Sequence, residues 1–214
     1  MTDPRSELIL ALDTSTKTGA IVLAESTGTE VTPLASREFK TERSHNSAIF
    51  EPLGEFLTLA GSRPINTILA GTGPGSYTGI RIGIASANGL ATSINTRAVG
   101  VPSALGIAPR VGDFLVVGDA RRGNVFHWSI LNGIPKGSPT IVPRADLQNI
   151  VEQGQLPVYS MDDLATDFEM VTRHPDPLVM TQRYLANRSH WDSQTSIEPV
   201  YLAAPFVTTP KKTR

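Results

Sequence analysis

The feature of the sequence that most constrains the fold is the segment 65–95, INTILAGTGPGSYTGIRIGIASANGLATSIN. It predicts an apolar strand over 67–70, a glycine-rich loop over 71–75 and a helix of about four turns that begins near 77–79. Strand, tight glycine turn and helix form the repeating unit of α/β domains. The segment therefore predicts an α/β fold.

Small residues recur at every fourth position of the predicted helix, at Gly79, Gly83, Ala87 and Ala91. They stack into one ridge of nearly bare backbone. Two interior glycines cost a helix roughly 1 kcal/mol each relative to alanine, so tertiary contacts must offset them. Two explanations are open: the ridge seats the helix on its own sheet, or it lets a helix of another subunit approach closely.

Length and composition exclude several classes of protein. The 214 residues suit one large domain or two small ones. A net charge of −1 gives no overall positive field for nucleic acid, and the absence of cysteine excludes disulfides, thiolate metal sites and cysteine nucleophiles. The apolar run near the N-terminus is shorter than that of a signal peptide, and the sequence has no run of about 18 apolar residues. We expect a cytoplasmic protein that does not bind membranes.

The first half of the chain predicts three strands and an amphipathic helix. The strands are expected at 8–13, 20–24 and 34–39, and the helix at 44–60. Pro52 lies inside this helix and removes a backbone hydrogen bond, so we expect a kink or a late start there.

The second half repeats part of this design. Strands are expected at 97–101, 114–119, 124–131, 157–161 and 200–202, helices at 103–108, 145–153 and 178–187, and a loop over 132–143. Asp119 and Gly123 follow a strand as Asp13 and Gly19 do. This parallel indicates internal duplication of a ribonuclease-H-like unit.

The glycine loop lacks the residues of known phosphate and serine motifs. A Walker A loop needs Lys where Ile80 stands, and a dinucleotide fingerprint needs Gly where Ser76 stands. Pro74 replaces the first glycine of a Gly-x-Ser-x-Gly frame, which excludes a nucleophile elbow at Ser76. A turn required by geometry is the favoured interpretation, and an anion site at the N-terminus of the helix is the alternative.

Few other residues suggest chemistry. No two of the four histidines have the spacing that places two metal ligands on one helix face, and Asp162 and Asp163 are expected to be solvated. Asp13 and Asp119 lie at strand ends, where carboxylates hold magnesium or activate water. They are the candidate cofactor-binding residues, although capping of their own turns is the favoured interpretation.

Five segments carry a resemblance to a known family: LILALDTSTKTGAIVLAE at 8–25, RSHN at 43–46, GTGPGSYTGIRIGIASANGLA at 71–91, DARRGNVF at 119–126 and EPVYL at 198–202. Together they resemble the TsaB family, also called YeaZ. The resemblance spans nearly the whole chain and is weakest between 132 and 195.

The resemblance implies a two-lobed α/β fold of duplicated ribonuclease-H-like units. This is the actin and sugar-kinase (ASKHA) type, in the glycoprotease-like superfamily. We expect an N-terminal lobe at 1–101 that carries the partner-binding helices and a smaller lobe at 102–214, whose C-terminal segment packs back on the first.

The resemblance also implies a non-catalytic subunit that activates TsaD, the enzyme that adds threonylcarbamoyl to the anticodon-adjacent adenosine of tRNA. TsaE completes the complex, and ATP or ADP, magnesium and a metal are expected in the partner subunits. Ser103 and Ile107 stand where TsaD has its two metal-binding histidines, and Ile107 cannot coordinate a metal. The alternatives are a stand-alone ATP- and magnesium-dependent phosphotransferase and a metalloprotease.

In this family two helices of each subunit form a four-helix bundle, which implies that helices 44–60 and 79–95 bind TsaD. The expected partner-binding residues are Ile49, Leu53, Phe56, Gly79, Ile80, Gly83, Ala87 and Leu90, with Gly83 and Ala87 at the helix crossing. The same apolar surface predicts a homodimer when TsaD is absent. Only indirect contact with tRNA is expected, because Lys211, Lys212 and Arg214 are too few to argue for more.

Overall fold

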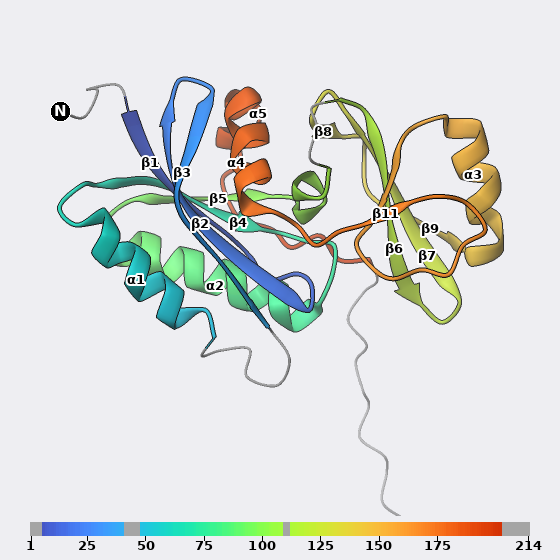
Figure 1. Cartoon of the computed structure of the whole chain (residues 1–214), viewed down its shortest axis with the longest axis horizontal. Coiled ribbons are helices and arrows are strands. Elements are labelled where there is room, and N and C mark those ends of the chain that lie inside the picture. Colours follow the sequence, from blue (N-terminus) through green and yellow to red (C-terminus); the bar gives the residue numbers. More distant parts are fainter. Residues whose placement is uncertain (1–5, 41–47, 109–111, 203–214) are drawn as a thin grey trace, which may run out of the picture.

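The structure is a computed structural model that describes residues 6–40, 48–108 and 112–202 (Figure 1). It has two sheets lying side by side, with helices on both faces of the first. The RSHN motif and the three basic residues of the C-terminal tail lie outside the described residues.

The first sheet has the strand order β3-β2-β1-β4-β5. Its strands are β1 (Ser6–Asp13), β2 (Thr18–Thr27), β3 (Glu30–Lys40), β4 (Ile65–Gly71) and β5 (Arg97–Val101). β2 pairs antiparallel with both β1 and β3, whereas β1, β4 and β5 run parallel. The continuous apolar run of β1 reflects its central place, because helices cover both faces of the sheet.

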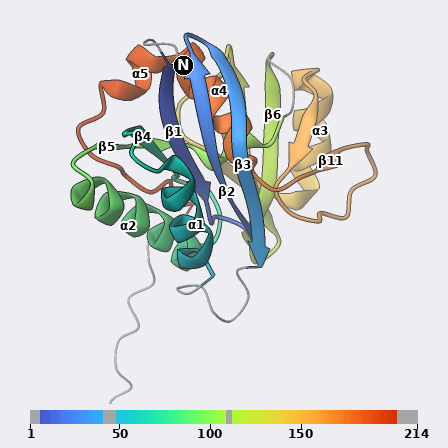
Figure 2. The same ribbon diagram turned by 60° about the vertical axis from the view of Figure 1, so that its left-hand side comes forward.

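The two faces of this sheet are covered by different helices (Figures 1 and 2). One face packs Leu8, Leu10 and Leu12 against α1 (Phe50–Ala60) and α2 (Tyr77–Ser93). The other packs the alternate residues of β1 against α4 (Pro177–Ala186) and α5 (Arg188–Asp192). This alternation is the period of two expected of a strand.

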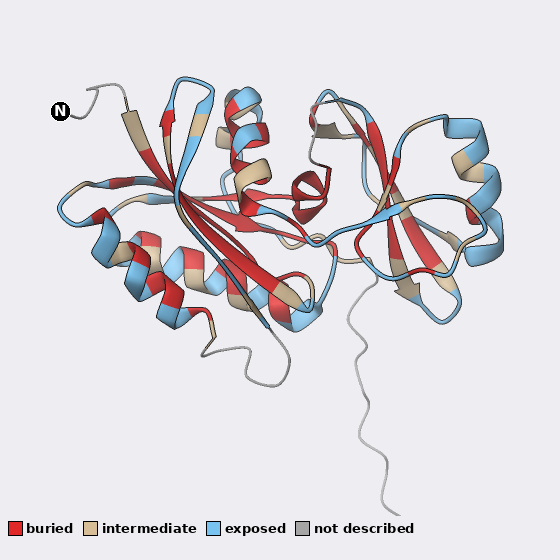
Figure 3. Cartoon of the chain, in the orientation of Figure 1, coloured by how far each residue is buried: buried red, intermediate tan, exposed pale blue. Residues whose placement is uncertain are grey.

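The second sheet has the order β11-β10-β6-β7-β8, and β9 pairs with β7. Its strands are β6 (Phe114–Arg121), β7 (Asn124–Leu131), β8 (Ile134–Pro135), β9 (Thr140–Pro143), β10 (Val158–Ser160) and β11 (Val171–Thr172). The helix α3 (Leu147–Gly154) packs on one face of this sheet. Residues on the other face belong to the same hydrophobic core as α4. Buried residues therefore form a continuous interior between the two sheets (Figure 3).

Some predicted elements differ in detail. α1 begins at Phe50, so Pro52 lies in its first turn, which is the predicted late start. The segment 132–143 was predicted to be a loop, which is wrong because it contains β8 and β9. The predicted strand at 200–202 is absent, although the amide of Val200 donates to the carbonyl of Thr72 at 2.8 Å. The 103–108 segment is a short 3-10 helix over 103–106.

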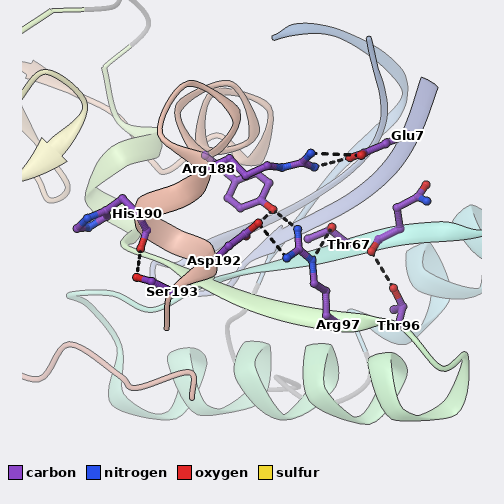
Figure 4. Close-up of polar contacts among 10 residues, drawn as sticks. Glu7, Thr67, Thr96, Arg97, Arg188, His190, Asp192 and Ser193 are labelled. Atoms are coloured by element: carbon purple, nitrogen blue, oxygen red, sulfur yellow. Dashed lines mark hydrogen bonds and ion pairs between the residues drawn. The ribbon is translucent and has the colours of Figure 1, made fainter. Parts of the chain in front are cut away.

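A polar network fixes α4 and α5 to the first sheet (Figure 4). Arg188 forms a two-pronged ion pair with Glu7 of β1. Arg97 of β5 donates to the hydroxyl of Tyr184 at 2.7 Å and pairs with Asp192 at 2.9 Å. Tyr184 in turn donates to Asp192 at 2.8 Å, which closes a triangle of polar contacts. The late segments of the chain are thereby held on the lobe formed by the early ones.

Within the described ranges, no helix is both long and apolar enough to span a membrane.

Candidate functional site

The ridge of small residues on α2 faces the chain's own sheet. Gly79, Gly83, Ala87 and Ala91 are all buried. A β-carbon at Gly79 would lie 2.0 Å from the carbonyl oxygen of Thr14, and one at Gly83 would lie 2.6 Å from the Thr14 hydroxyl. The Thr14 hydroxyl also donates to the carbonyl of Gly79 at 2.6 Å. The structure therefore favours the first of the two explanations, in which the ridge seats α2 on β1.

The other residues expected at the partner surface are mostly buried too. Ile49 and Ile80 are fully buried, and Leu53 and Phe56 are nearly so, all in the core between the helices and the first sheet. Leu90 is half-buried. The amphipathic stripe found in the sequence is thus the side of α1 that meets its own sheet. A surface formed by α1 and α2 must use other residues.

A largely apolar groove of about 490 Å³ lies on the outer face of α2, beside the first residue of α1. We call it the α1–α2 groove, and its lining residues are Phe50, Tyr77, Thr78, Arg81, Ile82, Ala85 and Ser86. Phe50 leaves 60% of its surface exposed, which is unusual for so large an apolar side chain. Phe50 was not among the residues predicted from the sequence, because it lies outside the apolar stripe of α1. A large apolar side chain outside that stripe was the available sign of a binding surface.

Each helix also carries one glycine on its exposed side. Gly54 in α1 and Gly89 in α2 are exposed, and nothing lies within 4 Å of the place a β-carbon would take. An interior helix glycine costs roughly 1 kcal/mol relative to alanine. No contact within the described chain explains why these positions are glycine. Close approach by another backbone is the kind of contact that requires such residues.

The groove is bounded at one end by an aromatic cluster. The rings of Tyr77 and Tyr201 stack with centroids 5.1 Å apart, and the Arg81 guanidinium lies 4.5 Å from the Tyr77 centroid. Arg81 Nε also donates to the Tyr201 hydroxyl at 3.1 Å. Tyrosine and arginine are the residue types that most often dominate binding energy at protein interfaces. The cluster brings the EPVYL segment to the start of α2.

Asp13, the first candidate cofactor residue, is buried and 1% exposed. Its Oδ1 accepts hydrogen bonds from the Ser15 amide at 2.8 Å and the Ser15 hydroxyl at 2.7 Å. Burial raises the pKa of the Asp13 carboxyl, and the contacts with Ser103 and Ser15 oppose that rise. A β-carbon at Gly71 would overlap its Oδ2. These contacts are those of a side chain that caps its own turn.

The glycine loop closes against the turn that follows β1. The amide of Ser76 donates to the Ser15 carbonyl at 2.7 Å, and the amide of Gly73 donates to the Ser103 hydroxyl at 2.9 Å. Gly75 has φ of +154°, and its hypothetical β-carbon would lie 2.3 Å from the Ser15 carbonyl oxygen. Since the amides of Gly73 and Ser76 are used within the chain, they are not free to bind a phosphate, which favours a turn required by geometry.

Asp119, the second candidate, lies at a cleft of about 520 Å³ between the two lobes. Its Oδ1 accepts from the Arg121 amide at 2.8 Å, and its Oδ2 pairs with the Arg121 guanidinium at 3.1 Å. The Asp119 amide donates to Asp162 Oδ2 at 2.9 Å. Asp162 also lines the cleft, and it is exposed, as predicted. Asp13 does not line this cleft, so the two candidates do not face a common space there.

Ser103 and Ile107, the two positions at which the resemblance led us to look for metal ligands, are structural in this chain. Ser103 is buried and receives the Gly73 amide, and Ile107 is 1% exposed in the core. His174 pairs with Glu38 at 2.8 Å on the surface. In the part of the chain that the structure describes, no three His, Asp or Glu side chains gather as metal ligands would.

Comparison with known proteins first identifies the class of fold to which the chain is similar. A family model described as "TsaD: tRNA N6-adenosine threonylcarbamoyltransferase" matches residues 38–138. The fold matches that of YeaZ from Pseudomonas aeruginosa, with a TM-score of 0.65 over 92% of this chain and 100% of that one, at 23% identity. A second crystal structure, of a protein with similarity to peptidase YEAZ from the same organism, gives a TM-score of 0.68 at 20% identity, with the same coverage of both chains. The fold is thus the α/β fold of the YeaZ structures, with two sheets, which agrees with the predicted fold class.

Two curated relatives narrow this further. TsaB of Escherichia coli, named as a tRNA threonylcarbamoyladenosine biosynthesis protein, is 34% identical over 145 residues, which is 62% of this chain and 60% of that protein. An uncharacterized protein of Mycobacterium tuberculosis is 36% identical over 84 residues, 39% of this chain and 40% of that protein. The chain thus spans only 40% to 60% of the lengths of these relatives. The chain is thus similar to TsaB (YeaZ) proteins, which is the resemblance that the sequence motifs predicted.

Proposed function

We propose that this chain is a non-catalytic subunit in the biosynthesis of threonylcarbamoyladenosine on tRNA. It acts by forming a heterodimer with TsaD, the catalytic subunit, in the cytoplasm. TsaE joins the pair, and nucleotide, magnesium and the catalytic metal are held by the partners. Similarity to TsaB of Escherichia coli supports the pathway.

The observation that carries the heterodimer is the α1–α2 groove. It combines an exposed phenylalanine, Phe50, with half-buried Ile82 and exposed Ala85. Two exposed glycines on the same helices allow a partner helix to approach closely. Apolar surface buried in a complex contributes about 25 cal/mol per Å² before the costs of association. The proposed binding surface lies on the two helices that the sequence predicted, but it is formed by other residues of those helices.

The state of the two candidate cofactor-binding residues supports a non-catalytic role. Asp13 is buried beside Gly71 and is bonded to its own turn. Asp119 is held by Arg121 and lies against Asp162. A phosphotransferase needs carboxylates that face the substrate phosphates together. This arrangement disfavours the stand-alone phosphotransferase.

Substitution of Ala85 by arginine tests the groove directly. Ala85 is exposed on α2 and lines the groove, so Ala85→Arg adds bulk and charge there without disturbing the core. Ala145 is exposed in the second lobe, and Ala145→Arg is the matched control. We expect Ala85→Arg to abolish co-purification with TsaD and Ala145→Arg to leave it unchanged. Wild-type affinity for TsaD in the Ala85→Arg variant would contradict the proposal.

Calorimetry on the purified chain tests the non-catalytic part separately. We expect no heat of binding from ATP with magnesium when the chain is alone. Saturable binding with hydrolysis of the nucleotide would favour the phosphotransferase instead.

A further inference from the structure

The outer face of α2 carries a row of residues that become smaller along the helix. In chain order they are Tyr77, Arg81, Ala85 and Gly89, at every fourth position, so they lie on one face. All four are exposed, and the first three line the α1–α2 groove. A helix of another subunit can therefore lie close to α2 at Gly89 and meets larger side chains toward Tyr77.

Arg81 is the only charged residue among the described residues that line the groove. Its Nε–H donates to the Tyr201 hydroxyl at 3.1 Å, and its guanidinium lies 4.5 Å from the centroid of the Tyr77 ring. The rings of Tyr77 and Tyr201 stack with their centroids 5.1 Å apart. These contacts hold the guanidinium in a defined position at the end of the groove, although the side chain is exposed.

The two terminal nitrogens of Arg81 have no acceptor in the described part of the chain. The hydrogen bond that Arg81 makes there comes from Nε, and no carboxylate of the described residues pairs with its guanidinium. Glu55, an acid of the neighbouring helix α1, is paired with Arg37 at 2.7 Å. The charge of Arg81 is therefore balanced only by solvent while the groove is open.

A partner that covers the groove removes this guanidinium from water. Burial of an unpaired charge is strongly unfavourable, and buried N–H donors without acceptors add to the cost. The partner must therefore bring an acceptor to Arg81. A carboxylate fits best, because it neutralises the charge and its two oxygens accept from the parallel N–H groups of a guanidinium.

We propose that the α1–α2 groove receives a helix of TsaD that carries an aspartate or glutamate, whose carboxylate forms a two-pronged ion pair with Arg81. This assignment rests on the proposed heterodimer and specifies the chemistry of the partner surface. The partner helix lies closest to α2 at Gly89, where nothing fills the space of a β-carbon. Since a helix rises about 1.5 Å per residue, Arg81 lies about 12 Å from Gly89 along the axis. The carboxylate is therefore expected about two helical turns from the closest contact.

Charge reversal at Arg81 tests the ion pair. Arg81→Glu places like charges together, and we expect it to raise the Kd for TsaD at least about 30-fold in calorimetry. Arg81→Gln keeps most of the side chain without its charge and should raise the Kd about tenfold. Arg144 is exposed on the second lobe, so Arg144→Glu is the matched control for net charge and should leave the Kd unchanged.

Rescue by the opposite reversal identifies the partner residue. Each exposed aspartate and glutamate on the helices of TsaD is replaced singly by arginine, and each variant is titrated with the wild-type chain and with Arg81→Glu. We expect one of these variants to bind the wild-type chain weakly. The same variant should bind Arg81→Glu with a Kd within about threefold of that of the wild-type pair, because the two substitutions are coupled.

An unchanged Kd for Arg81→Glu, or a scan in which no reversal restores binding, would overturn the proposal and leave the heterodimer intact. Absence of any binding between the wild-type chain and TsaD would instead refute the proposed function, and this inference with it. The other candidate source of the carboxylate is a second copy of this chain, which exposes Glu51 on α1. Self-association that is lost in Arg81→Glu and restored by Glu51→Arg, with TsaD affinity independent of Arg81, would assign the ion pair to a homodimer and overturn the proposal.

Discussion

Because α2 packs closely on its own sheet, substitution of glycine by alanine should have opposite effects on stability at two positions of this helix, Gly79 and Gly89. At Gly79, a β-carbon would lie 2.0 Å from the backbone carbonyl oxygen of Thr14. The helix and the end of β1 must then move apart, and overpacking of this kind costs about 1–3 kcal/mol. At Gly89, nothing lies within 4 Å of the same atom. Alanine there brings only its better helix propensity, about 0.8–1 kcal/mol.

Thermal unfolding followed by circular dichroism measures both effects. In a chain of this size, 1 kcal/mol corresponds to about 2–4 °C in Tm. We expect Gly89→Ala to raise Tm by about 2–4 °C and Gly79→Ala to lower it by at least about 2 °C. Gly83→Ala should fall between them, because its β-carbon meets the Thr14 hydroxyl rather than backbone. Equal Tm values for Gly79→Ala and Gly89→Ala would refute the seating of the ridge on β1.

Three further predictions follow from buried and exposed side chains. Burial raises the pKa of Asp13 above its ordinary value of 3.8, so the folded state binds its proton more tightly and stability falls as pH rises from about 3.8 through the raised pKa. Asp13→Asn should remove this slope, and identical pH dependence of the urea midpoint in both proteins would contradict it. Tyr184→Phe should cost about 1 kcal/mol in urea unfolding, because it removes the hydroxyl between Arg97 and Asp192; a change near zero would show that the hydroxyl is dispensable. Phe50→Ser should change stability by less than about 0.5 kcal/mol, yet weaken TsaD binding at least about tenfold in calorimetry, as expected of an interface hot spot. An unaltered affinity would remove Phe50 from the interface.

The fold class could be predicted from the sequence because local and global signals agree. β1 is a continuous apolar run since it lies in the middle of a sheet covered on both faces. Ile80, Ile82 and Ile84 alternate as in a strand, but the apolar and small residues continue to Ile94, which is longer than most strands and favours a helix. The structure confirms a helix of 17 residues.

The direction of the small-residue ridge could not be predicted. A row of small residues on a helix indicates that another element packs closely against it, but does not indicate whether that element is the chain's own sheet or another helix. Here Thr14 occupies the space, which depends on how the β1 end meets α2 in three dimensions. The α1–α2 groove was not predicted either, because Phe50 and Ala85 form no periodic pattern in the sequence and come together only in three dimensions.

The link between Asp119 and Asp162 depends on pairing between distant segments. β10 runs parallel to β6, with Ser160 opposite Val117, so the residues that follow each strand end come together. Neither strand reveals this pairing locally. β8 and β11, each of two residues, are too short to give any periodic signal.

The central claim is that the chain works through the outer faces of α1 and α2 and not through its cleft. The most direct measurement is threonylcarbamoylation of tRNA by TsaD, TsaE and the adenylate-forming enzyme, with each of two variants of this chain. Ala85→Arg alters the groove, and the double variant Asp119→Asn with Asp162→Asn removes the carboxylates of the cleft. The account predicts loss of product with Ala85→Arg and wild-type rates with the double variant. Full activity with Ala85→Arg together with loss in the double variant would contradict it.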